Sequence, residues 1–207
     1  MDRISIKKRA REYTRKNKWN YWKVALLAFL IMIVLESIII AVTAAMGGIG
    51  AIISMLLTLG YMPLMVGLMY CLLQITRDKK YNINDLFKFF KFVVPIFVLM
   101  FLVTLLTTIG LILLIIPGII ISLMFSMVMY IFADGETSAS ACMRKSRELM
   151  RGHKLDYFIL YLSFIGWMLL VPFTLGLLLI WLVPYIQFSS QIFYEDLLAK
   201  KENSLTN

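Results

Sequence analysis

Long apolar runs alternate with short charged segments along this chain, and this alternation limits the fold more than any single motif does. An apolar run of about 20 residues is long enough to cross a bilayer as a helix. Hydrophobic side chains make up 61% of the 207 residues, whereas soluble domains contain roughly 45–50%. We therefore predict an all-α, polytopic membrane helical bundle that forms one membrane domain over residues 1–207.

Six apolar segments are the predicted transmembrane helices. Residues 24–133 contain the first four spans, and residues 157–194 contain the last two. A basic segment (1–23) precedes them, a polar segment (134–156) divides them, and a polar tail (195–207) follows and is expected to fray. Glycine and proline positions predict where the chain turns or kinks: the Met46–Gly50 turn, Pro63, Pro117 with Gly118, Pro172 and Pro184.

The distribution of charge predicts the topology. Of the 21 basic residues, nine precede the first span, five lie between the second and third, five between the fourth and fifth, and two follow the sixth. The turns near Gly48, Pro117 and Thr174 carry no basic residue. By the positive-inside rule, both termini and both charged loops are expected to be cytoplasmic.

The number of full crossings is open at the fourth span. Residues 119–133 form a run of only 15 residues, or about 22 Å of helix against about 30 Å of hydrocarbon. The turns near Pro117 and Thr174 are therefore either exposed outside or embedded in the membrane. A hairpin that enters and leaves on one side gives the same charge distribution.

Two charged segments flank the spans. Residues 1–23 are either a solvated basic tail or a short interfacial helix with Ile6, Ala10 and Tyr13 on its apolar face. Trp19, Tyr21 and Trp22 are expected at the headgroup level. In the second segment, residues 77–92, Asn84 is the expected N-cap of a short helix. This helix would lay four apolar side chains on the membrane while two lysines reach the headgroups: Leu86, Phe87, Phe89 and Phe90, with Lys88 and Lys91.

Residues 134–156 have the periodicity of a helix with two different faces. Thr137 or Ser138 can cap its start, and Gly152 can end it in a left-handed conformation. One face collects mainly apolar and small side chains: Ala139, Cys142, Met143, Ser146, Leu149, Met150 and His153. The other carries Arg144, Arg147 and Arg151, which we call the arginine ridge. This ridge is either a solvated connector surface or a docking surface for a protein partner or anionic lipid.

Short motifs in the second half resemble a known family. They are IIPGII (115–120), KSRELMRGHK (145–154), LSFIGW (162–167), TLG (174–176), WLVPY (181–185) and FYEDL (193–197). In this order they resemble domain of unknown function 975, an integral-membrane family of Gram-positive bacteria. The resemblance implies a six-helix protein without an established biochemical activity. The family pattern often has a lysine where this chain has Ile121, so a function that needs that lysine is not expected here.

Glu36 is the only acidic residue within a predicted span. An ionised carboxylate at that depth costs about 2.5–3.5 kcal/mol on insertion scales, so we expect a protonated or hydrogen-bonded side chain. A neutral acid bonded to a Ser, Thr or Tyr of another helix is one reading, and a proton or cation site is the other. Small residues four apart, such as Ala41 and Ala45, predict close helix packing.

No catalytic, cofactor or metal motif is present in the sequence. His153 is the sole histidine, and Cys71 and Cys142 are expected to be free thiols. The net charge of +9 is explained by residues beside spans, so nucleic acid is not an expected partner. The leading hypothesis is a non-enzymatic protein of the bacterial cell membrane that associates with itself, with partner membrane proteins or with anionic lipid. The alternative is a small transporter or export and immunity-type protein that uses Glu36.

Overall fold

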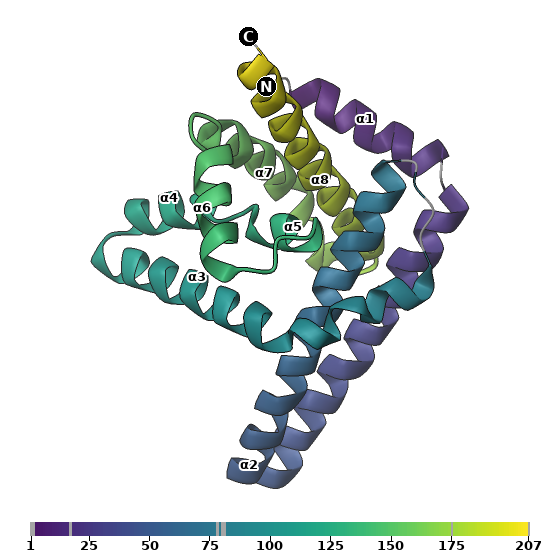
Figure 1. The fold of residues 1–207 in the computed structure, drawn as a ribbon. Helices are drawn as coiled ribbons and strands as arrows, with labels where there is room; N and C mark the ends of the chain where they lie inside the picture. Colours follow the sequence, from purple (N-terminus) through teal and green to yellow (C-terminus); the bar gives the residue numbers. More distant parts are fainter. Residues whose placement is uncertain (1–2, 17, 78, 80–81, 175, 207) are drawn as a thin grey trace.

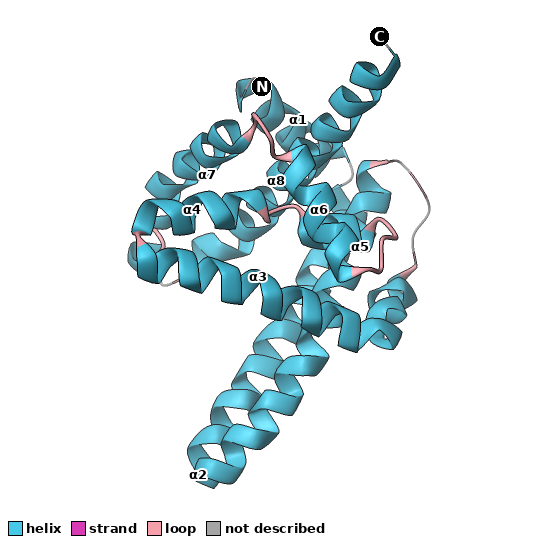
Figure 2. Ribbon diagram, turned by 60° about the vertical axis from the view of Figure 1, so that its left-hand side comes forward, coloured by secondary structure: helices cyan, strands magenta, loops and turns pink. Residues whose placement is uncertain are grey.

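The structure is a computed structural model that describes residues 3–16, 18–77, 79, 82–174 and 176–206. These residues form helices and connecting turns and contain no strand (Figures 1 and 2). The all-α prediction is therefore confirmed for the described part of the chain. In order, the elements are α1 (Arg3–Lys16), α2 (Lys18–Thr76), η1 (Ile83–Phe92), α3 (Val93–Leu113), α4 (Ile115–Met124), α5 (Val128–Ala133), α6 (Ala139–Leu149), α7 (Lys154–Met168), η2 (Pro172–Thr174) and α8 (Leu177–Thr206).

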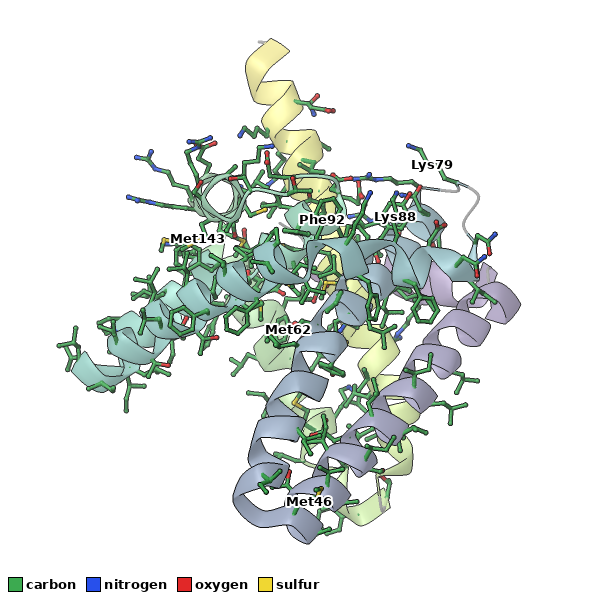
Figure 3. All side chains as sticks on the ribbon, turned by 60° about the horizontal axis from the view of Figure 1, so that its bottom comes forward. Met46, Met62, Lys79, Lys88, Phe92 and Met143 are labelled. Carbon is green, nitrogen blue, oxygen red and sulfur yellow. The ribbon has the colours of Figure 1, made fainter. Side chains whose placement is uncertain are left out.

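The long element α2 is a helical hairpin. A Cβ atom placed on Gly50 would overlap the carbonyl oxygen of Val42, although residues eight apart in a straight helix are separated by about 12 Å. The chain therefore reverses at the predicted Met46–Gly50 turn, and Figure 1 shows the two antiparallel legs. Met46 lies at the free tip of the hairpin (Figure 3). Pro63 is buried within the second leg, where helix continues on both sides of it.

The short 3-10 helix η1 packs against the second leg of α2. Its N-cap is Asn82 rather than the predicted Asn84. The reason is a capping box: the Asn82 side chain accepts from the Asn84 N–H at 3.3 Å, and Asp85 accepts from the Asn82 N–H at 2.9 Å. Leu86 and Phe89 are buried, and the backbone of Leu86 lies where a side chain on Gly67 would be. Half of the face predicted for the membrane thus packs on protein.

Helices α3 and α4 form a second hairpin, and its turn differs from the predicted one. The break falls at Leu114, which is extended (φ −161°, ψ 142°), instead of at Pro117 and Gly118. Pro117 sits in the first turn of α4, where the missing N–H has no helical partner to lose. Gly118 packs against α3, since a Cβ there would lie 2.7 Å from the backbone nitrogen of Leu111.

The fourth predicted span is divided into two helices. Residues 125–127 form a turn between α4 and α5, and α5 is buried apart from Met129. Buried Ser146 of α6 donates a 2.8 Å hydrogen bond to the carbonyl of Met124, the last residue of α4. Carbonyls at a helix end lack intrahelical donors, so this bond fixes α6 against the C-terminal end of α4. The last two predicted spans correspond to α7 and α8, although the tail of residues 195–206 extends α8 instead of fraying. Pro184 lies within α8.

A large apolar surface remains exposed on the outer helices. Residues 111–116 at the α3–α4 turn are all exposed, with Ile112 at 79% and Leu114 at 67%. Within the described part of the chain, three segments are long and apolar enough to cross a membrane: Leu59–Thr76, Ile83–Leu113 and Ile115–Ala133. Soluble monomers rarely expose contiguous apolar patches of this kind, so the fold is that of a membrane-associated helical protein.

Candidate functional site

A layer of ion pairs joins the ends of several helices at one side of the molecule. Arg77, directly after α2, donates from Nη1 and Nη2 to the two carboxylate oxygens of Asp134 at 2.5 and 3.0 Å. Its Nε donates to Glu195 of α8 at 2.8 Å. The hydrogen bond to Asp134 raises the pKa of the Arg77 guanidinium above its ordinary value, although burial opposes this. One guanidinium therefore ties α2 to the end of α5 and to α8.

Tyrosines connect this layer to the interior. The Tyr194 hydroxyl donates to Asp134 at 3.1 Å, and the ring of Tyr194 stacks on Tyr130 with centroids 5.7 Å apart. The Tyr130 hydroxyl in turn donates to the side-chain oxygen of Gln187 at 3.3 Å. These three contacts connect Asp134 to Tyr194 and Gln187 of α8 through Tyr130 of α5.

Helix α1 docks on α8. Ile6 and Ala10 are buried, and Arg9 forms two hydrogen bonds with the carboxylate of Asp196. Lys7 lies over the ring of Phe164, 4.6 Å from its centroid. These contacts exclude the solvated-tail reading for residues 4–11. The side chains of Trp19, Tyr21 and Trp22 lie outside the described residues.

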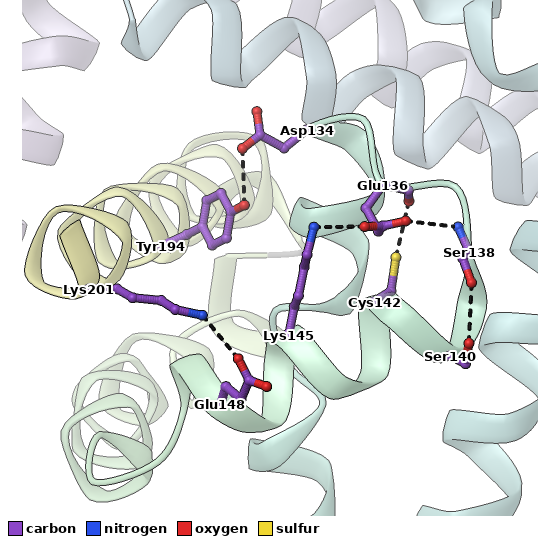
Figure 4. Close-up of polar contacts among 9 residues, drawn as sticks. All are labelled: Asp134, Glu136, Ser138, Ser140, Cys142, Lys145, Glu148, Tyr194 and Lys201. Atoms are coloured by element: carbon purple, nitrogen blue, oxygen red, sulfur yellow. Dashed lines mark hydrogen bonds and ion pairs between the residues drawn. The ribbon is translucent and has the colours of Figure 1, made fainter. Parts of the chain in front are cut away.

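A cavity of about 210 Å³ opens between the α5–α6 region and α8. It is lined by four charged residues, one tyrosine and three aliphatic residues: Asp134, Glu136, Lys145 and Lys201; Tyr194; and Ile131, Leu149 and Leu198. Figure 4 shows Lys145 and Lys201 reaching from α6 and α8 toward the space between these helices. Because small-molecule sites are concave and combine apolar walls with a few polar groups, this cavity is the candidate site.

Two ion pairs hold the lysines of the cavity. Lys145 donates to Glu136 at 2.7 Å, and Lys201 donates to Glu148 at 3.0 Å (Figure 4). These hydrogen bonds lower the pKa of both glutamates. The carboxylates are ionised at neutral pH, so each ammonium group is held in place by a charged partner.

Gln191 is a buried polar residue on the cavity side of α8. It precedes Tyr194, Leu198 and Lys201 by three, seven and ten residues, which places all four on one helix face. The Gln191 side chain is 0% exposed, and neither amide atom has a hydrogen-bond partner among the described residues. An unsatisfied buried polar group costs about 1–3 kcal/mol. Gln191 is therefore an unsatisfied buried group beside the cavity, although it does not line it.

The residues selected from the sequence lie in different places. Arg144, Arg147 and Arg151 are exposed, whereas Cys142, Ser146 and Leu149 of the same helix are buried. Glu36 is exposed on the first leg of α2 and does not line the cavity; Tyr61 of the second leg lies within range of its charge. Gly152 has a φ of +82°, the left-handed conformation expected after α6.

The structure also places the other residues that the sequence singles out. His153 pairs with Asp156 at 3.1 Å, and Pro172 begins η2. Both cysteines are free and buried. In the described part of the chain, no three His, Cys, Asp or Glu side chains are grouped closely enough to hold a metal ion.

Reasoning from the sequence did not identify Arg77, Lys201 or Gln191 as site residues. In the sequence, Arg77 and Lys201 are two of many basic residues beside the spans, and Gln191 is one of several polar residues in the last span. The spacing of Gln191, Tyr194, Leu198 and Lys201 along one face was a usable signal, because polar residues on a buried helix face require partners.

The fold and this polar layer define the class of a helical, membrane-associated protein. Residues 99–201 match the family model described as protein of unknown function (DUF975), so the chain belongs to this family. The resemblance drawn from the motifs is confirmed. No match was found among curated proteins or solved structures.

Proposed function

We propose that this protein is a non-enzymatic, multi-pass protein of the bacterial cell membrane that acts by association, with its cytoplasmic face binding anionic lipid headgroups. In this proposal the chain crosses six times, and both termini are cytoplasmic. The supporting observation is the position of charge relative to the apolar α2 tip: Lys79 and Lys88 lie toward one end of the molecule, and Met46 lies at the opposite end (Figure 3).

The arginine ridge is the part of this face best suited to anionic headgroups. Its three members are exposed on or directly after one helix, and guanidinium groups can bind phosphate through two parallel hydrogen bonds. Each basic residue near an anionic membrane surface contributes about 1 kcal/mol. Association with a second copy or with a partner membrane protein would use the same exposed face and is a separate outcome of the test below.

Lipid retention by the purified protein tests this role. We expect native mass spectrometry from mixed phosphatidylglycerol and phosphatidylcholine micelles to show preferential retention of phosphatidylglycerol. Replacing Arg144, Arg147 and Arg151 with Gln should abolish the preference, and replacing them with Lys should keep most of it. A Gln variant that retains the preference would exclude the ridge as the lipid site. Loss of a copurifying membrane protein with unchanged lipid would favour protein association.

Cysteine accessibility tests the topology. In a background without native cysteines, a Leu114→Cys variant should react with an impermeant maleimide from outside intact cells, because the six-crossing topology places the α3–α4 turn on the outer side. A Thr137→Cys variant should react only after the membrane is opened. Protection of position 114 from outside reagent would reduce the number of crossings below six.

A further inference from the structure

The charges around the cavity are balanced, and each is held by an ion pair. Two carboxylates, Asp134 and Glu136, and two ammonium groups, Lys145 and Lys201, line the same space. A ligand that matches this lining carries both signs of charge. The cavity volume of about 210 Å³ equals about seven water molecules at about 30 Å³ each, so the ligand is small.

The charged groups can bind a ligand without giving up their present partners. A carboxylate has about four acceptor positions, and Asp134 uses three of them for the two bonds from Arg77 and the one from Tyr194. An ammonium group has three donors, so Lys145 can keep Glu136 and donate to a second anion. The ion pairs therefore fix these groups in advance of binding, which reduces the entropy lost on binding.

Gln191 lies behind the cavity wall on α8 and is not one of the residues that line the cavity. Its amide offers both donors and an acceptor, and it lies one helical turn before Tyr194 on the cavity-lining face of α8. It is fully buried and has no partner within the described structure. Because the neighbouring side chains shield its amide from the cavity, Gln191 is not a ligand contact in this site.

We propose that this cavity binds a small zwitterion with one ammonium and one phosphate group, the chemistry of a phosphoethanolamine headgroup. The phosphate lies between Lys145 and Lys201, because its oxygens point in several directions and can accept from two helices at once. The ammonium lies beside Asp134 and Glu136. The ligand is either the headgroup of phosphatidylethanolamine or a soluble molecule with the same charges. This site does not depend on the arginine ridge.

Calorimetry with soluble probes tests the charge requirement. We expect the detergent-purified full chain to bind phosphoethanolamine at least tenfold more tightly than ethanolamine, glycerol phosphate or glycine. Equal binding of glycerol phosphate would overturn the zwitterion assignment in favour of a simple anion site. Absence of phosphoethanolamine binding, together with equal retention of phosphatidylethanolamine and phosphatidylcholine in native mass spectrometry, would overturn the site.

Nanodiscs of defined lipid composition distinguish a lipid headgroup from a soluble zwitterion as the ligand. If the lipid headgroup occupies the cavity, phosphatidylethanolamine nanodiscs should weaken binding of the soluble probe at least tenfold relative to phosphatidylglycerol nanodiscs. Equal binding in the two would assign the site to a soluble zwitterion. Neither result changes the phosphatidylglycerol preference expected from the arginine ridge. Failure of the cavity site can therefore be distinguished from failure of the proposed lipid-binding function.

Three variants complete the test. Lys201→Gln should lower probe affinity at least tenfold, whereas Lys200→Gln removes the same charge from the neighbouring exposed position and should leave affinity unchanged. Gln191→Leu, at a buried position that does not line the cavity, should leave affinity unchanged while the unfolding temperature stays equal or rises, because the unsatisfied amide is gone. Unchanged affinity in Lys201→Gln would refute the site.

Discussion

Arg77 and Asp134 are joined by two parallel hydrogen bonds across 57 residues of sequence. Arg77 also binds Glu195, 118 residues away, so three segments of the chain meet at one guanidinium. Arginine suits this position because its planar group donates in fixed directions to two partners. The pairing positions the α5 end of the cavity relative to α8, since Asp134 and Tyr194 both line it.

Replacing Arg77 with Gln should destabilise the fold by about 1–3 kcal/mol, because two partly buried carboxylates lose their cation. Arg77→Lys should recover only part of this, since an ammonium cannot reproduce the two-bond geometry. Thermal unfolding in detergent measures both. Arg147→Gln, at an exposed position, is the matched control and should change stability by less than about 0.5 kcal/mol. Equal stabilities for Arg77→Gln and this control would contradict the structural role of Arg77.

Gly118 should not tolerate a side chain. A Cβ at this position would lie 2.5 Å from the side chain and 2.7 Å from the backbone nitrogen of Leu111, so Gly118→Ala must separate α3 from α4 at a cost of about 1–3 kcal/mol. Gly166 of α7 has nothing within 4 Å of its Cβ position. Gly166→Ala should therefore stabilise by about 0.5–1 kcal/mol through helix propensity. Unfolding temperatures that shift in the same direction for the two variants would refute the close contact.

Cys142 should be unreactive in the folded protein. Burial and the charge of Glu136 raise the pKa of its thiol to about 12, and its Sγ donates to the Glu136 carbonyl at 3.1 Å. At pH 8 the thiolate fraction is then about one in ten thousand, and the thiolate is the reactive form. In a Cys71→Ala background, maleimide labelling should be slow until denaturant is added, whereas an added Ser140→Cys should label quickly. Rapid native labelling of Cys142 alone would disprove its burial.

Acid should release the end of α8 from α6. The hydrogen bond from Lys201 holds the pKa of Glu148 below its ordinary 4.5. A depressed folded pKa means that the stabilisation is present above pH 4.5 and is lost as pH falls through the lower folded value. Hydrogen exchange of residues 198–203 should therefore accelerate in acid, beyond the intrinsic pH effect. Lys201→Gln should show the faster exchange already at neutral pH. Identical pH profiles for the two proteins would show that the pair contributes nothing.

Features set by local sequence could be predicted, whereas contacts between residues far apart in the sequence could not. Hydropathy predicted the all-α class, and glycines marked the α2 reversal and the end of α6. The α3–α4 turn was misplaced because Pro117 is acceptable inside the first helical turn, and the contact of Gly118 with Leu111 becomes visible only when the hairpin is folded. The ion pairs of Arg77 have no local signature, because every partner lies at least 57 residues away.

The α2 hairpin lies wholly before the family-matched residues 99–201, and its close Val42–Gly50 contact joins positions only eight apart. Short sequence separation makes such contacts form early. During synthesis, the contacts of this hairpin can therefore form while the later helices are still being made. Leu86 of η1 can then pack against Gly67. Arg77 gains its carboxylate partners only after Asp134 and Glu195 have been synthesised. The second half of the chain thus supplies the carboxylates that hold the end of α2.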